Sequence, residues 1–260
     1  MIEAVGSFAI QSARSVWEFV ELGLSTARAF WRQLFKRRFR WNETVHQTYD
    51  IAVLSLPVMV FSLTFVSLMF TIEFSFHMKL VLGQDSLVPA FSTVFMLREF
   101  GPVVTCFLLT SRVGAAIAAE VATMKVTDQI DALKILAIDP IEYLAVPRWI
   151  ACVFACVSIS LVSVGIAILG GALIASLKLG YSTGQYFNSM FTFTRFVDFQ
   201  ECFLKAFVFG SLIPIAALYH GFRARYGAEG VGEATTRAVV SGFLLIFIAD
   251  FLLTYLLYRV

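Results

Sequence analysis

Charge is scarce in this sequence. Only 15% of its 260 residues are Asp, Glu, Lys or Arg, whereas 59% are hydrophobic and the mean hydropathy is +0.81. A soluble domain carries about 25% charged residues, so the composition excludes an ordinary soluble globular protein and indicates a membrane protein. The net charge of +2 is also too small for a nucleic-acid-binding surface spread over the molecule, and we expect no nucleic-acid partner.

Metal-binding and catalytic patterns are lacking as well. The four cysteines lie in or beside apolar stretches without a CxxC spacing, which argues against a zinc site or a disulfide framework. The sequence has no HExxH, GxSxG or Walker A pattern, and its three histidines are scattered over separate segments. We therefore expect a non-enzymatic protein without a cofactor or metal of its own. If the protein consumes ATP, another chain must bind the nucleotide.

Long uncharged stretches are what the sequence has instead. Between Asp50 and Glu73 lie 22 uncharged residues, which as a helix would reach roughly 33 Å, enough to cross a bilayer. Four further apolar segments follow, the longest with 29 uncharged residues between Arg148 and Lys178. We predict an all-α integral membrane protein with a single domain over residues 1–260. Its five transmembrane helices are predicted at about 51–72, 87–118, 149–177, 205–222 and 238–258.

Lys and Arg are distributed unevenly over the connections between these spans. Seven precede the first span, and the connections at 112–148 and 223–237 add four and three, whereas the opposite side of the membrane has five. Because cytoplasmic loops retain positive charge, this asymmetry predicts a cytoplasmic N-terminus and, after five crossings, an external C-terminus. The first long apolar run begins at Ile51, which is too deep for a cleaved secretory leader.

The segment at 8–40 combines a polar and an apolar stripe. Polar residues from Arg14 to Lys36 recur at three- and four-residue spacing, and the opposite stripe includes Trp17 and Trp31. We predict an amphipathic helix that lies in the cytoplasmic headgroup layer, with its basic end KRRFR near anionic lipid. A soluble helix packed against a partner protein is the alternative interpretation.

Three ionisable residues interrupt the apolar spans: Arg98, Glu99 and Asp250. Each costs about 2.5 to 3.5 kcal/mol on insertion scales, so each is a candidate functional residue. Arg98 is 14 residues from Arg112 and Asp250 is 13 from Arg237, which places both roughly 20 Å above the cytoplasmic boundary. Two interpretations of Arg98 and Asp250 stay open: a buried salt bridge, or the polar lining of a cavity for a charged headgroup. Glu99, which has no obvious cationic partner, favours the cavity.

Two further patterns have plainer interpretations. One is a ladder at helical spacing near the external end of the fourth span, interpreted as a solvated helix face: Arg195, Asp198, Glu201 and Lys205. The other is a stripe of small residues at every fourth position in the third span: Ser163, Ala167, Gly171 and Ala175. Such a stripe predicts close helix packing, either within the chain or in a homodimer.

The stretch from Arg98 to Arg148 carries the most specific pattern. In order it contains REFGPVV, SRVGAAIAAEV, MKVTDQIDAL and AIDP, and ATTRAVV follows at 234–240. These motifs resemble the MlaE-type permease family of bacterial Mla-type lipid ABC transporters, which work with MCE-domain proteins. The resemblance implies a homodimeric permease of the bacterial inner membrane that moves phospholipid through a cavity between its protomers. It further implies that ATP and Mg²⁺ bind a separate ATPase subunit, and that an MCE-domain ring forms the conduit towards the outer membrane and so maintains envelope lipid asymmetry.

The resemblance also places the coupling helix, which contacts the ATPase, at 120–140. Independently of the family, that segment predicts a short amphipathic helix, with residues such as Val121, Ile130 and Leu136 on its apolar side. The candidate coupling residues are Glu120, Met124, Lys125, Thr127, Asp128, Gln129, Asp131 and Asp139. Without the motif, an interfacial helix with no partner would be the preferred interpretation.

Two rival functions stay open at this point. One is a non-transporting membrane scaffold that recruits a cytoplasmic protein, although a scaffold has no need of charges in the middle of the membrane. The other is an ion-coupled carrier or channel in which Glu99 and Asp250 titrate.

Overall fold

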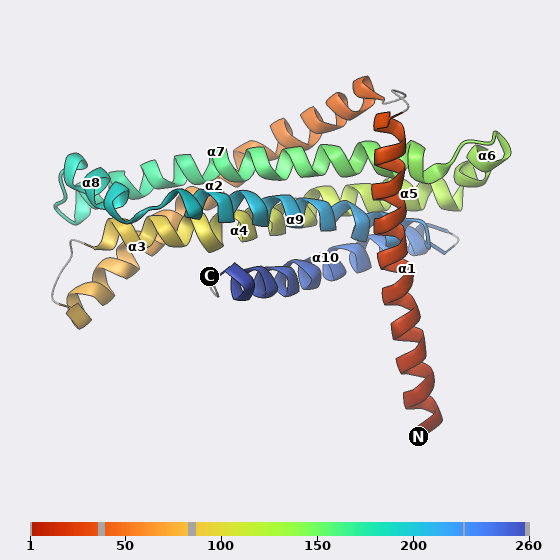
Figure 1. Cartoon of the computed structure of the whole chain (residues 1–260), viewed down its shortest axis with the longest axis horizontal. Helices are drawn as coiled ribbons and strands as arrows, with labels where there is room; N and C mark the ends of the chain where they lie inside the picture. Colours follow the sequence, from red (N-terminus) through yellow and green to blue (C-terminus); the bar gives the residue numbers. More distant parts are fainter. Residues whose placement is uncertain (1, 36–39, 83–86, 226, 258–260) are drawn as a thin grey trace. The chain divides into compact units, whose positions relative to one another are not determined.

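The computed structural model describes residues 2–35, 40–82, 87–225 and 227–257, with side chains from residue 14 onward except at position 82. Over these ranges the chain consists of helices joined by short connections and contains no β-strand (Figure 1). Five helices are long and apolar enough to cross a membrane: Trp41–Val81, Val88–Val126, Ile141–Lys178, Phe196–Gly221 and Gly227–Leu257. The predicted all-α class with five spans is confirmed.

The helices extend beyond the spans that the uncharged runs predict. The first and fifth spans are α2 (Trp41–Leu82) and α10 (Gly227–Leu257). The difference that bears on the site is in the fourth span, α9 (Phe196–Gly221), which begins well before the predicted start at 205. Three charged residues, Asp198, Glu201 and Lys205, lie inside this helix and are buried, so a boundary drawn at the last charge is wrong.

The second span is one helical run with two π-helical turns. It consists of α3 (Val88–Phe95), η1 (Met96–Phe100), α4 (Gly101–Leu109), η2 (Thr110–Gly114) and α5 (Ala115–Val126). Pro102 lacks the N–H that would close an α-helical turn onto the carbonyl of Arg98, and the wider turn of η1 accommodates this loss. The π-helical turn carries Arg98 and Glu99, and such turns occur frequently at functional sites.

The described residues fall into two compact units. Unit 1 comprises those of Met1–Thr48, Thr110–Cys152 and Ser211–Leu244, and unit 2 those of Tyr49–Leu109, Val153–Gly210 and Leu245–Val260. The single permease domain over residues 1–260 stays a prediction.

In unit 1, α1 (Ile2–Phe35) packs against η3 (Ile141–Ala145) and the start of α7 (Val146–Lys178). Ala29, Val146 and Ile150 are buried at this contact, and Gln33 donates a hydrogen bond to the carbonyl of Glu142 at 2.8 Å. The predicted apolar stripe lies elsewhere on α1 and is exposed, at Trp17, Val20, Leu24, Trp31 and Leu34. An exposed stripe is available to a headgroup layer, and that location stays a prediction. Positions 36–39 of the basic end lie outside the described residues.

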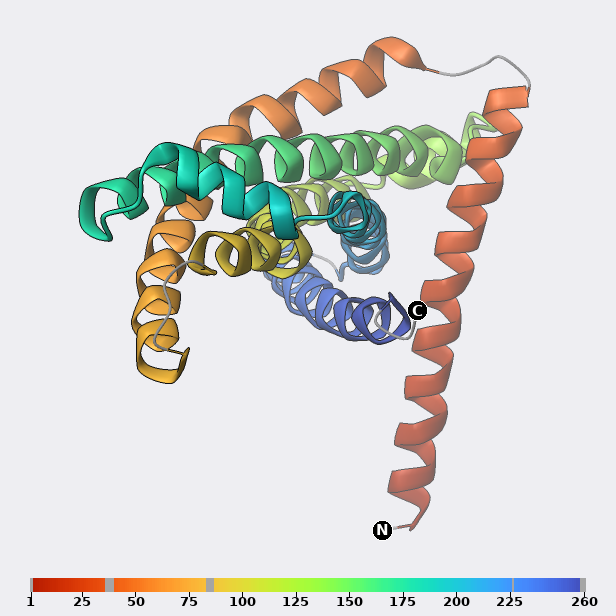
Figure 2. The ribbon, with the colours of Figure 1, turned by 60° about the vertical axis from the view of Figure 1, so that its left-hand side comes forward.

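In unit 2, α8 (Thr183–Phe193) folds back beside α3 and the end of α7 (Figures 1 and 2). A capping box of Ser182 and Gln185 begins this helix. The stripe of small residues in α7 is buried within the unit, and the hydroxyls of Thr71 and Tyr186 lie 3.0 Å from where a Cβ of Gly171 would be. The packing seam that this stripe predicts is therefore intramolecular.

Candidate functional site

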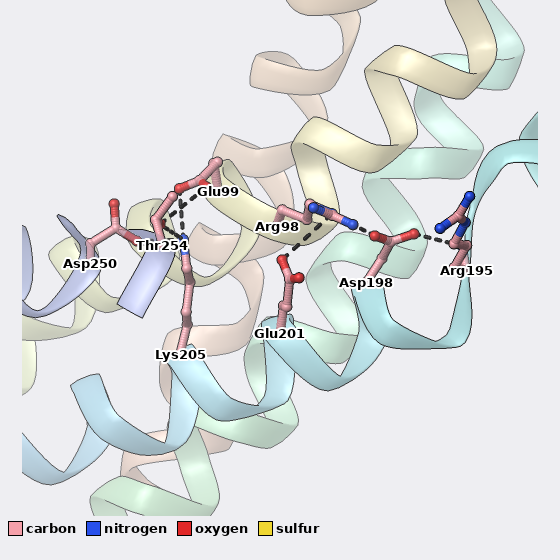
Figure 3. A network of polar contacts seen from close by, with 8 residues as sticks. All are labelled: Arg98, Glu99, Arg195, Asp198, Glu201, Lys205, Asp250 and Thr254. Atoms are coloured by element: carbon pink, nitrogen blue, oxygen red, sulfur yellow. Dashed lines mark hydrogen bonds and ion pairs between the residues drawn. The ribbon is translucent and has the colours of Figure 1, made fainter. Parts of the chain in front are cut away.

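Charged residues from three spans form a network of two neighbouring clusters in unit 2, one around Arg98 and one around Lys205 (Figure 3). Arg98 and Glu99 come from η1, and Asp250 comes from α10. The other three members are Asp198, Glu201 and Lys205 of α9. Their spacing of three and four residues places these three on one face of α9, which is the face that meets η1 and α10.

Arg98 is held by two carboxylates of α9. Its Nε donates to Asp198 Oδ1 at 2.5 Å and lies 3.5 Å from Glu201 Oε2. The second oxygen of Asp198 accepts the backbone N–H of Arg195 at 2.6 Å. Asp198 lies in the first turn of α9, where the helix dipole favours a negative charge. Asp198 thus both begins the helix and fixes the guanidinium.

Lys205 lies between two other carboxylates. Its Nζ donates to Glu99 Oε2 at 2.7 Å and to Thr254 Oγ1 at 2.8 Å, and it forms an ion pair with Asp250 Oδ1 at 2.7 Å. An ammonium has three donors; two of them make these hydrogen bonds, and Asp250 adds an opposite charge. Thr254 Oγ1 donates in turn to Glu99 Oε1 at 3.4 Å. Hydrogen bonds together with opposite charges are what a cation requires when it is removed from water.

The network has an accessible side and a buried side. The side chains of Arg98, Glu99 and Asp250 are 20%, 26% and 21% exposed, whereas those of Lys205 and Asp198 are only 1% exposed. The three sequence-predicted cavity candidates are therefore the more exposed members of the network, and their place in a cavity stays a prediction. The buried residues of α9 are counter-ions that hold them in place.

The network also carries an excess of acid. It contains four carboxyl groups and two cationic groups, which gives a formal charge of −2 when all are ionised. Its accessible side presents one guanidinium and two carboxylates. This arrangement can accept a cationic group at Glu99 and Asp250, and an anionic group at Arg98.

Two expectations about these residues are wrong. Glu99 has a cationic partner, Lys205, and the three members of the ladder that lie in α9 are buried rather than solvated, whereas Arg195 precedes the helix and is exposed as expected. Both errors follow from starting the fourth span at Lys205, which placed this lysine at the edge of the membrane and the two carboxylates before it outside. Arg98 and Asp250 do not form the salt bridge with each other that was one interpretation; each pairs with a residue of α9. The signal in the sequence for buried counter-ions was the spacing that places Asp198, Glu201 and Lys205 on one helix face.

The coupling candidates lie in unit 1, and they do not form one helix over 120–140. α5 ends at Val126, and a second helix, α6, covers Gln129–Ile135. Between them Asp128 adopts a left-handed backbone with φ of 58°, a conformation that Asp tolerates better than most residues. Ala137 has φ of 57°, and Asp139 Oδ1 then accepts the N–H of Ile141 at 2.9 Å before η3 begins.

Ion pairs tie these short helices together. Asp131 of α6 accepts hydrogen bonds from Lys134 at 2.8 Å and from Lys125 of α5 at 3.1 Å. These bonds, with Lys134 contributing most, hold the pKa of Asp131 below its ordinary value. Glu120 of α5 pairs at 2.6 Å with Arg148 of α7, whose other nitrogen donates to the carbonyl of Leu144.

The tip of this segment is exposed. Thr127, Asp128 and Gln129 form its polar part. Its apolar part is Ile135 and Leu136, which are 85% and 69% exposed. Leu136 was expected on the apolar side and Ile135 was not among the candidates. Two adjacent exposed aliphatic residues beside charged groups are typical of a surface that a partner covers.

The chain is similar in sequence to a family of membrane permeases. Residues 44–256 match the family described as Permease MlaE. A probable ABC transporter permease protein of Rickettsia typhi is 44% identical over 163 residues, which are 63% of each chain. One of Synechocystis is 34% identical over 226 residues, covering 87% of this chain and 86% of that one. The chloroplastic protein TRIGALACTOSYLDIACYLGLYCEROL 1 of Arabidopsis thaliana is 32% identical over 242 residues, covering 93% and 69%.

Proposed function

Because the chain belongs to the MlaE permease family, we propose that it moves phospholipid between the bacterial inner membrane and an MCE-domain conduit towards the outer membrane. The resemblance predicted from the motifs between Arg98 and Arg148 is confirmed. Membership makes the chain a multi-pass ABC transporter permease. Its cargo, its partners and its membrane are the subject of the proposal.

The charged network of unit 2 is the observation that carries the lipid assignment. Three partly exposed charged groups are held by buried counter-ions among otherwise apolar helices. A scaffold has no use for such groups in a membrane, whereas an amphiphile needs polar contacts for its headgroup and apolar walls for its tails. The name of the Arabidopsis relative is that of a glycerolipid, which supports a lipid as cargo.

The accessible side of the network suits a zwitterionic headgroup. Glu99 and Asp250 would receive its ammonium group and Arg98 its phosphate. In the homodimer that we propose, the cavity between the two protomers would bring two copies of this network to one lipid.

ATP and Mg²⁺ belong, in this proposal, to a separate ATPase subunit, since the sequence has no Walker A pattern. The ATPase would grip the exposed tip formed by Thr127, Asp128, Gln129, Ile135 and Leu136. The bonds of Asp131 and the pair of Glu120 with Arg148 link this tip to α5 and α7. A tip fixed in this way would transmit the closing of the ATPase to the spans, which a flexible loop would absorb.

The orientation belongs to the proposal too. The excess of Lys and Arg before the first span and in the 112–148 and 223–237 connections favours a cytoplasmic N-terminus and a periplasmic C-terminus. The ATPase would then meet 120–140 from the cytoplasm, and the MCE-domain protein would meet the opposite face. The exposed aromatic stripe of α1 suits the cytoplasmic headgroup layer.

Reconstitution with the ATPase and MCE partners tests the proposal. Glu99→Gln and Asp250→Asn are expected to lower ATP-dependent phospholipid transfer between vesicles, while the control Glu73→Gln leaves it unchanged. Glu73 is 61% exposed, and within the described part of the chain it forms an ion pair only with His77, one helical turn away. Transfer by both network variants at the wild-type rate would reject the role of the network. Transfer that needs a proton gradient and not ATP would favour an ion-coupled carrier, and a complex that transfers no lipid would favour a scaffold.

A further inference from the structure

A groove on unit 2 is lined by none of the three cavity candidates. It has a volume of about 630 Å³ and is lined by α7, α8 and the first turn of α9. Its walls are almost entirely aliphatic and aromatic, including Leu169, Phe191 and Phe199, each of which is exposed. Gly165 lies in its floor, where an added Cβ would meet no atom within 4 Å. The volume lies within the range of about 300 to 1,000 Å³ typical of small-molecule sites.

One end of the groove is polar. Arg195 lines it, and within the described part of the chain no carboxylate forms a salt bridge with its guanidinium. Its backbone N–H, in contrast, is bonded to Asp198. Thr194 lines the same end, and its Oγ1 is buried without a hydrogen-bond partner among the described residues. A buried hydroxyl without a partner is costly, and it lies next to a cation that no carboxylate neutralises.

We propose that this groove binds one acyl chain of an anionic phospholipid. The headgroup of this lipid pairs with Arg195 and accepts a hydrogen bond from the hydroxyl of Thr194. An apolar channel with a cation and a hydrogen-bond donor at one end matches a molecule that carries its negative charge at one end of a hydrocarbon chain. A transmembrane helix of a partner protein matches less well, because it would need a carboxylate at the same depth as Arg195 beside an otherwise apolar face.

This site goes beyond the proposed transport function. It requires neither ATP nor the ATPase, and its lining includes none of the partly exposed network residues Arg98, Glu99 and Asp250. It is a binding site for a resident lipid on the surface of the protein, and it selects by headgroup charge.

The test uses the full-length protein alone in lipid nanodiscs. Phosphatidylglycerol with a photoreactive diazirine in its acyl chain is added, and the labelled peptides are identified by mass spectrometry. We expect label on residues 161–169 and 187–199. Unlabelled phosphatidylglycerol should compete about fivefold better than phosphatidylcholine, the preference that one arginine near a membrane surface provides.

Two variants with matched controls separate the chain contact from the charge contact. Gly165→Leu fills the groove and should lower labelling at least about fivefold with either headgroup. Gly184→Leu, at another position where a Cβ meets nothing within 4 Å, should leave labelling unchanged. Arg195→Gln should remove the preference for phosphatidylglycerol, and Lys178→Gln, an exposed cation outside the lining, should retain it.

Labelling that Gly165→Leu leaves unchanged, or a preference that survives Arg195→Gln, would overturn the inference. So would cross-links from this groove to another polypeptide in place of lipid. Labelling as expected in a protein that transfers no lipid with its ATPase would keep this inference and reject the proposed function.

Discussion

Lys205 donates a hydrogen bond to Glu99 over 2.7 Å, although 106 positions separate the two residues in the chain. The same ammonium lies 2.7 Å from Asp250 and is 1% exposed. One buried cation therefore joins η1, α9 and α10 within unit 2. Because neither carboxylate has another cationic partner among the described residues, the local balance of charge depends on Lys205.

The first prediction concerns that cation. Lys205→Met should lower the free energy of unfolding by about 3 to 5 kcal/mol, because it leaves two carboxylates facing each other without a counter-ion. Chemical unfolding in detergent, followed by circular dichroism, measures this change. Lys178→Met, which removes an exposed lysine of α7, is the control and should change stability by less than about 0.5 kcal/mol.

Adding Glu99→Gln to Lys205→Met should recover part of the lost stability, since it removes one of the two stranded charges. Equal stability of Lys205→Met and the wild type would mean that the ammonium is not buried against these carboxylates.

The second prediction concerns Asp131, which lies outside the spans. Its pKa should be below the ordinary Asp value, because Lys134 and Lys125 bond to its charged form. A lowered pKa in the folded protein means that the ionised carboxylate stabilises α6 above the unfolded pKa, near 3.8. This stabilisation is lost as the pH falls through the lower folded value. The contacts of Asp131 should therefore be unchanged between pH 7 and about pH 5.

Carbon-13 NMR of selectively labelled aspartate measures this titration. Lys134→Met should raise the pKa of Asp131 more than Lys125→Met does, because the bond from Lys134 contributes most. Lys178→Met is again the control. A larger rise in the pKa of Asp131 in Lys125→Met than in Lys134→Met would contradict the hydrogen-bond geometry around Asp131.

The third prediction concerns the exposed tip of the coupling segment. Ile135→Asp and Leu136→Asp should each release the ATPase in a pull-down. Each places a charge in the proposed interface, where two exposed aliphatic side chains would otherwise be buried against the ATPase. The fold should be retained, since both residues are exposed in the chain alone. Thr183→Asp, at the exposed start of α8 in unit 2, should leave ATPase binding unchanged.

Asp128 allows a separate control within the segment. Its left-handed backbone means that Asp128→Lys combines a change of charge with backbone strain, whereas Asp128→Gly removes the charge alone. Loss of the ATPase in both variants would assign a role to the carboxylate. ATPase binding that survives all of these substitutions would move the contact away from 120–140.

Some features of the fold and the site could be predicted from the sequence, and the others could not for physical reasons. The five spans, the family motif and the three reachable charges follow from hydropathy and from single residues. The partners of those charges do not, because Arg98 and Asp198 are 100 positions apart and a charged helix face looks the same whether water or a counter-ion covers it. The break in the coupling segment depends on one left-handed residue, Asp128, which leaves the apolar periodicity nearly unchanged.

The last prediction concerns Gly101, the residue that follows the π-helical turn. A Cβ at this position would run into the side chain of Val164 and the carbonyl oxygen of Met96. The valine can shift, but the carbonyl belongs to η1 itself, so the turn that aims Arg98 and Glu99 would have to move. Gly101→Ala should therefore lower the free energy of unfolding by about 1 to 3 kcal/mol, as overpacking does. It should also lower lipid transfer.

The comparison with Gly165 isolates the cause. Gly165→Ala adds the same methyl group to a helix where nothing lies within 4 Å, so it should raise stability by up to about 1 kcal/mol through helix propensity. Adding Val164→Ala to Gly101→Ala should restore only part of the loss, because the contact with the Met96 carbonyl remains. Complete rescue by Val164→Ala would show that side-chain crowding alone requires a glycine at 101. Incomplete rescue, with transfer still reduced, would mean that the backbone of η1 sets the direction of the charged pair.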